Sequence, residues 1–169
     1  MKTFFTLIAI AAGALLSGCA TGKNGLALNT VGPPLSQPTA ANSTNGTLVV
    51  YSAYEVNADF NSRDPNRPEY SDYRILTDDG KLLQRVHNDS GTALQDPVAV
   101  GLPPGKYRVS VRANGYGYVT VPVIIETQQS TILHLEGGGS WPNESAFNQT
   151  NAVRLPDGQI IGWKAATNL

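Results

Sequence analysis

The only cysteine of this chain, Cys19, is the residue whose neighbours best define a chemical role. It follows a cationic start at Lys2, an apolar run over residues 3–16 and two small residues, Ser17 and Gly18. The run is too short for a stable membrane span, and the layout is that of an exported leader with a cleavage site. A lone cysteine cannot form an internal disulfide, so its sulfur is available to accept a lipid.

This layout resembles the signal of bacterial lipoproteins. The resemblance implies that residues 1–18 are removed and that the mature chain begins at Cys19, with lipid on its sulfur and its amino group. An ordinary buried thiol or a plain secretory signal is a weaker interpretation. Two or more acyl chains anchor a protein durably, so the predicted partner of Cys19 is the membrane. In the lipoproteins that this chain resembles, an aspartate after the cysteine favours inner-membrane retention. Ala20 occupies that position, which predicts a lipid-anchored protein of the cell envelope, in the outer membrane.

The other polar residues form no catalytic or metal-binding motif. The histidines, His87 and His134, have no partner at metal-ligand spacing. Neither a Gly-x-Ser-x-Gly element nor a phosphate-binding loop occurs. One acidic loop could attract calcium, but its spacing matches no EF-hand and its interleaved arginines oppose cation binding. The loop contains Asp59, Arg63, Asp64, Arg67, Glu69 and Asp72. We therefore predict a non-enzyme with no catalytic residue, no metal and no cofactor.

Aromatic residues are the best sequence argument for a binding role, because sugar rings stack on exposed aromatic faces. The favoured alternative places Tyr51 or Tyr54, Tyr73 and Tyr107 in a hydrophobic core. Four other aromatic residues are the candidate contacts for a ligand or partner. These are Tyr116, Tyr118, Trp141 and Trp163. Tyr116 and Tyr118 flank a glycine in a turn, so we expect them to be exposed.

Charge and composition divide the mature chain. Loss of Lys2 leaves 11 basic residues (12 − 1) against 13 acidic ones. The resulting net charge of −2 provides no positive electrostatic potential that would attract nucleic acid. Residues 19–45 are rich in Pro, Asn, Ser and Thr without apolar periodicity, which predicts a lipidated flexible tether. A β-domain over 46–137 and an irregular tail over 138–169 follow.

The pattern over residues 46–137 predicts β-strands joined by tight turns. Tyr107, Val109, Val111 and Ala113 alternate with polar residues, as expected for a strand with one buried face. The same alternation runs from Val119 to Ile125. Pro122, which lacks an N–H, predicts that this second strand lies at an edge or pairs on one side there. Turns are predicted at 78–80 and 114–115, and seven strand candidates occur in all.

One part of this region resembles the carboxypeptidase regulatory-like family, whose members are transthyretin-like β-sandwiches. The resemblance rests on the segments 101–109, Gly-Leu-Pro-Pro-Gly-Lys-Tyr-Arg-Val, and 113–116, Ala-Asn-Gly-Tyr. A long polar stretch, Glu55–Ser71, departs from the family pattern. The predicted fold is all-β: a small seven-stranded transthyretin-like or Ig-like β-sandwich.

The tail predicts a short hairpin over residues 153–163, with a Pro-Asp-Gly turn. Such a hairpin needs another apolar surface, and we expect Leu155, Ile160 and Trp163 to provide the contact with the sandwich. Two functions remain open. The first is a structural or protein-interaction role with an envelope partner, through a sheet edge or the tail. The second is carbohydrate or peptidoglycan binding by exposed aromatics.

Overall fold

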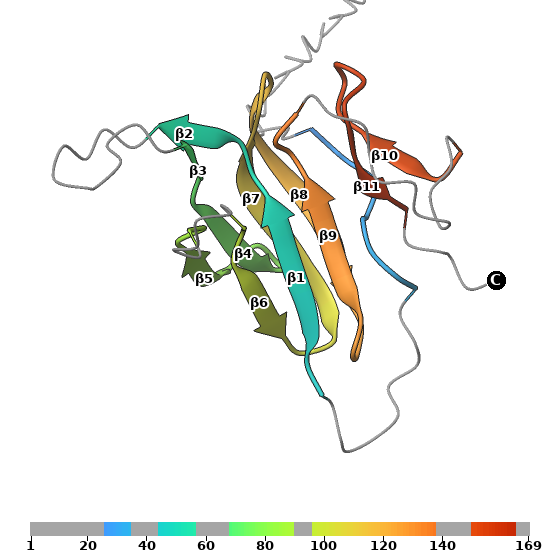
Figure 1. Cartoon of the computed structure of the whole chain (residues 1–169). Helices are drawn as coiled ribbons and strands as arrows, with labels where there is room; N and C mark the ends of the chain where they lie inside the picture. The colour runs from blue at the N-terminus through green and yellow to red at the C-terminus, as the bar shows by residue number, and fades with distance from the viewer. Residues whose placement is uncertain (1–25, 35–43, 57–67, 90–95, 138–149, 165–169) are drawn as a thin grey trace, which may run out of the picture.

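The computed structural model describes residues 26–34, 44–56, 68–89, 96–137 and 150–164, and these form an all-β protein without helices. Two larger sheets share one hydrophobic core. Figure 1 shows β1 and β9 of one sheet in front of β7 and β8 of the other. The two sheets contain four and three strands. Two further pairs of short strands lie outside them.

The four-stranded sheet has the order β5-β4-β7-β8 and is antiparallel throughout. Its strands are β4 (Tyr73–Thr77), β5 (Leu82–Val86), β7 (Gly105–Ala113) and β8 (Gly117–Ile125). The predicted turns are confirmed: Gly80 and Gly115 adopt φ values of +87° and +73°, which glycine tolerates without a Cβ clash. β8 is the edge strand of the sheet, as Pro122 predicted.

The three-stranded sheet has the order β6-β1-β9. It consists of β1 (Gly46–Tyr51), β6 (Ala99–Leu102) and β9 (Ser130–His134). β1 runs antiparallel to β6 and parallel to β9. Leu48 and Val50 are fully buried, whereas the alternating residues of β1 are half-buried, so this sheet also turns one face to the core.

The core is formed by the inward residues of both sheets. The alternation over 105–125 is confirmed, because Val109, Val111, Val121 and Val123 are fully buried. Their neighbours Arg108 and Arg112 are exposed on the outer face. Tyr73 is buried and Tyr107 packs against the core, as expected. Tyr51 and Tyr54 are not core residues, which corrects that part of the interpretation.

The described residues form eleven strands: nine within 46–137, where seven were predicted, and two in the tail. β2 (Tyr54–Val56) pairs with β3 (Pro68–Tyr70), at the two ends of the polar stretch that the sequence left without strands. β10 (Ala152–Arg154) pairs with β11 (Ile160–Trp163) in the expected tail hairpin. The turn between them places Gly158 at φ +90°.

The tail hairpin packs into the same core as the two sheets. Val153, Leu155 and Ile161 are at most 2% exposed and belong to the main hydrophobic cluster. Of the expected contacts, Leu155 is buried in the core, whereas Ile160 and Trp163 are half-buried. Neighbouring residues of a strand alternate between faces, so the burial of Ile161 turns Ile160 away from the core.

Part of the predicted tether belongs to the fold. Val31 is 1% exposed and bridges β8 in a parallel manner. Its N–H donates to the Pro122 carbonyl at 2.9 Å, and its own carbonyl accepts from the Ile124 N–H at 2.9 Å. Gly32 continues toward the hairpin, where its N–H donates to the Trp163 carbonyl. Residues 26–34 therefore cover the β8 edge, and they do not form a free spacer.

Candidate functional site

Three tyrosines and a histidine form an aromatic cluster where β1 and β9 meet the β2–β3 ribbon. Tyr51 and His134 are cross-strand partners in the parallel β1–β9 pair, and their rings stack with centroids 4.5 Å apart and planes 5° apart. Tyr70 meets Tyr51 edge-on at 5.7 Å. Tyr54 then stacks on Tyr70 at 4.7 Å. We call these four residues the aromatic cluster.

The polar groups of the aromatic cluster are held by hydrogen bonds. The Tyr54 and Tyr70 hydroxyls lie 2.9 Å apart, and His134 Nδ1 lies 2.8 Å from Glu136 Oε1. Burial raises the pKa of Tyr70, and its hydrogen bond with Tyr54 adds to this effect. Burial also raises the pKa of Tyr51, with a smaller effect from the Asp96 carboxylate. The Tyr51 and Tyr70 hydroxyls therefore stay protonated over the physiological pH range.

One feature of the aromatic cluster suits a neutral ligand with hydroxyl groups. Tyr54 is 42% exposed, so one ring of the stack presents a face to solvent. The Oε2 atom of Glu136 is buried and has no hydrogen-bond partner among the described residues. Because the Glu136 oxygen is buried, the exposed ring of Tyr54 is the part of this site that matches a sugar, which is apolar on its faces and carries hydroxyls around its rim.

The structure brings together only two of the four aromatic residues predicted from the sequence. Tyr116 and Tyr118 flank Gly117 (φ +105°) at the β7–β8 turn and are 38% and 78% exposed. Their expected exposure is confirmed. Trp163 lies apart from them on β11 and is half-buried, whereas Trp141 and Cys19 lie outside the described residues.

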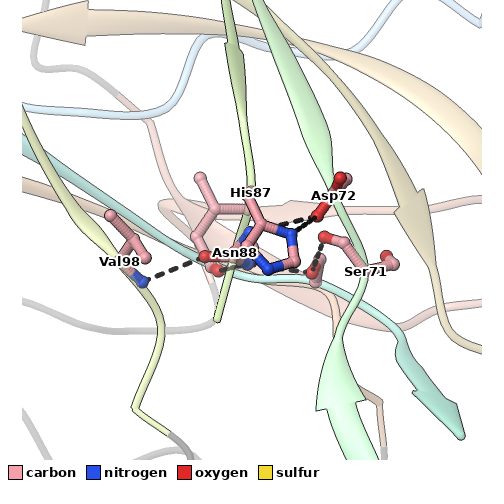
Figure 2. Close-up of polar contacts among 7 residues, drawn as sticks. Ser71, Asp72, His87, Asn88 and Val98 are labelled. Atoms are coloured by element: carbon pink, nitrogen blue, oxygen red, sulfur yellow. Dashed lines mark hydrogen bonds and ion pairs between the residues drawn. The ribbon is translucent and has the colours of Figure 1, made fainter. Parts of the chain in front are cut away.

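A network of hydrogen-bonded polar side chains joins the two sheets at the end of β5 (Figure 2). His87 Nδ1 lies 2.9 Å from Asp72 Oδ1, and the Asn88 N–H donates to the same oxygen at 3.2 Å. Both members of the His87–Asp72 pair are exposed, with side chains 74% and 66% accessible. An ion pair this exposed contributes little stability.

Asn88 is the buried centre of this network. Its Nδ2 donates to the Val50 carbonyl at 2.8 Å and to Ser52 Oγ at 3.0 Å, and its Oδ1 accepts from the Val98 N–H at 3.0 Å. The side chain is fully buried and links β5 to β1 and to the segment before β6. Ser52 Oγ in turn donates to the Ser71 carbonyl at 2.6 Å.

The hydrogen bonds of this network join the two sheets and serve the fold. A serine nucleophile needs its hydroxyl within hydrogen-bond reach of a basic histidine. Here Ser52 Oγ is engaged by Asn88 and the Ser71 carbonyl, and His87 contacts Asp72. Within the described ranges, no group of three or more metal-ligating side chains gathers. Of the acidic loop, Glu69 and Asp72 are described, and Asp59 and Asp64 lie outside the described residues.

Sequence reasoning missed the aromatic cluster because its members come from four strands. One usable signal existed: Leu48 and Val50 alternate with Tyr51, and Leu133 and Leu135 flank His134. Both patterns turn the aromatic ring away from the core. The parallel pairing that sets Tyr51 beside His134 leaves no trace in either segment alone.

Comparison with protein-family models, curated proteins and solved structures finds no match to this chain. The fold therefore defines the class of protein by itself: an all-β protein with two main sheets around one core. None of the described residues belongs to a helix long and apolar enough to cross a bilayer.

Proposed function

We propose that this chain is a lipid-anchored protein of the cell envelope, with a non-catalytic β-sandwich in a structural or protein-interaction role. The proposed location is the outer membrane. The observation that carries the proposal is the position of Cys19, directly after an apolar run and two small residues. No second cysteine competes for that role.

We further propose that the sandwich is a divergent transthyretin-like domain related to carboxypeptidase regulatory-like modules. The motif residues support this by their place in the fold. Pro103 and Pro104 form the connection from β6 to β7, and the Tyr107 hydroxyl donates back to the Pro103 carbonyl at 2.9 Å. This bond fixes the turn that the Gly-Leu-Pro-Pro-Gly-x-Tyr pattern encodes.

An exposed sheet edge supports the protein-interaction role. β5 is the outer strand of the four-stranded sheet, and its Leu82 and Leu83 are 51% and 50% exposed. An edge strand offers unpaired backbone groups to a strand of another protein, and exposed leucines add apolar area to such a contact. A partner would thus dock on β5 by extending the sheet.

Replacement of the lipid acceptor tests the anchoring. Cys19→Ser removes the only sulfur that can form a thioether, so incorporation of a fatty-acid analogue in cells should be lost and the protein should leave the membrane fraction. The matched control is Ser17→Ala, which keeps a small residue before the cysteine. Fatty-acid labelling that persists in Cys19→Ser would contradict the proposal.

A second candidate function, glycan binding, is favoured by the aromatic cluster. Tyr54, which is 42% exposed, offers a ring face to a sugar. The test is retention of the Cys19→Ser chain on purified peptidoglycan and on neutral polysaccharide resins. Tyr54→Ala should abolish retention, and Tyr118→Ala, which removes a more exposed ring elsewhere, should leave it unchanged. Equal loss in both variants would show unspecific aromatic adsorption.

A further inference from the structure

The path of residues 26–34 shows at which end of the sandwich the N-terminal segment joins the fold. Val31 bridges Val123 in the parallel direction, so the residues before Val31 run back along β8 toward its first residue, Gly117. Five residues before Val31, Leu26 is thus carried toward Tyr118. Figure 1 agrees, because the blue segment begins near the β7–β8 turn. The described chain therefore starts at the β7–β8 end.

The β7–β8 end exposes apolar and aromatic side chains. Tyr118 is 78% exposed, Tyr116 38% and Leu26 37%. Arg112, the cross-strand partner of Tyr118, is ion-paired with Glu55 at 3.1 Å, so its positive charge is already balanced within the protein. Exposed tyrosines are typical of the headgroup level of membranes, with the ring in the interface and the hydroxyl in water.

The chain between the lipid acceptor and the fold is short. Residues 19–25 are seven in number, and seven extended residues reach at most about 25 Å. A sandwich strand as long as β7, with nine residues, measures roughly 30 Å. The tether therefore holds the β7–β8 end within about 25 Å of Cys19. It sets no such limit for the opposite end, where the β4–β5 turn lies beside the start of β7.

We propose that the β7–β8 end is a membrane-docking surface, with Tyr116, Tyr118 and Leu26 in contact with phospholipid headgroups. This inference rests on the proposed lipidation of Cys19. Docking would orient the sandwich on its anchor and hold the β5 edge in a fixed direction for a partner. The occupant is the lipid surface itself, because the short tether delivers this end to it.

Site-specific fluorescence in vesicles tests the orientation. The full chain is expressed in bacteria and purified in its lipidated form, so the sulfur of Cys19 is blocked and one introduced cysteine carries the dye. Tyr118→Cys and Tyr116→Cys report the β7–β8 end. Lys81→Cys, in the β4–β5 turn, reports the opposite end. The vesicles contain phosphatidylethanolamine and phosphatidylglycerol with a headgroup-level spin-labelled lipid. Quenching at positions 116 and 118 should be severalfold stronger than at position 81.

The outcomes separate the two proposals. A lipidated chain that floats with vesicles but is quenched equally at positions 118 and 81 overturns the orientation and leaves the anchoring intact. Stronger quenching at position 81 overturns the orientation as well. A chain that does not float with vesicles overturns the anchoring, and with it the orientation. Matched melting temperatures of the labelled variants exclude misfolding as the source of a difference.

Discussion

Truncation of Val31 should destabilise the protein, although its sequence context is that of a tether. Val31 is 1% exposed and lies over Gly162, where an added Cβ would sit 2.5 Å from Val31 Cγ1. The valine methyl groups therefore fill the space left by the missing side chain of Gly162. Val31→Ala removes two buried methyl groups and leaves a cavity between β8 and β11.

The magnitude follows from the buried carbon atoms. Each contributes about 0.8 kcal/mol, and incomplete relaxation around the cavity raises the total cost to about 2–3 kcal/mol. The backbone hydrogen bonds to Pro122 and Ile124 persist in the variant, so the change isolates side-chain packing. For a chain of this size the melting temperature should fall by roughly 4–12 °C.

The assay is thermal and urea unfolding of the Cys19→Ser mature chain, with Leu26→Ala as the matched control. Leu26 belongs to the same segment and is 37% exposed, so its truncation should cost less than about 1 kcal/mol. Equal shifts for the two variants would refute the reasoning, because residues 26–34 would then lie on the sandwich without contributing to its core.

Three further tests of the packing use substitutions on the two sheets and the hairpin. Val111→Asp should lower the free energy of unfolding by several kcal/mol, since it buries a carboxylate without a partner. Arg112→Asp, on the outer face, should lower it by less than about 1 kcal/mol. Equal losses in urea unfolding would contradict the strand register. Ile161→Ala should lower the free energy of unfolding by about 2–5 kcal/mol and Ile160→Ala by clearly less, and the reverse order would contradict the docking of the hairpin. Burial raises the pKa of Tyr73 above its ordinary value of 10.0. Its contribution to stability is complete below pH 10 and is lost as the pH rises further, because the unfolded phenol ionises first. Its hydroxyl has no hydrogen-bond partner among the described residues, so Tyr73→Phe should retain stability at pH 8 and reduce the alkaline decline; an unchanged decline in urea melts between pH 8 and 11 would exclude Tyr73 as its source.

Much of the β-structure could be read from local pattern. The alternation from Tyr107 to Ala113 predicted both the strand and its buried face, because side chains of a strand alternate whatever the strand pairs with. Pro122 predicted an edge for β8, since it cannot donate to a neighbour. The Pro-Asp-Gly turn predicted the tail hairpin for the same local reason. These are properties of a few consecutive residues.

The candidate site could be predicted only in part. Exposure of Tyr116 and Tyr118 followed from the turn that they flank, and the structure confirms it. The aromatic cluster could not be predicted, because Tyr51 and His134 are 83 residues apart (134 − 51) and meet only through the β1–β9 register. Two half-buried rings on separate strands do not indicate in sequence which strand will lie beside them.

The sequence by itself determined the strand periods and the tight turns, and it is the only basis for the proposed lipidation of Cys19. Tertiary structure alone decided that Val31 enters the core, that β1 lies parallel to β9, and that Asn88 links the two sheets by hydrogen bonds. The physical reason is the range of the interactions. Turn geometry and side-chain alternation act between near neighbours, whereas the pairing of distant strands depends on many weak contacts that exist only once the core is closed.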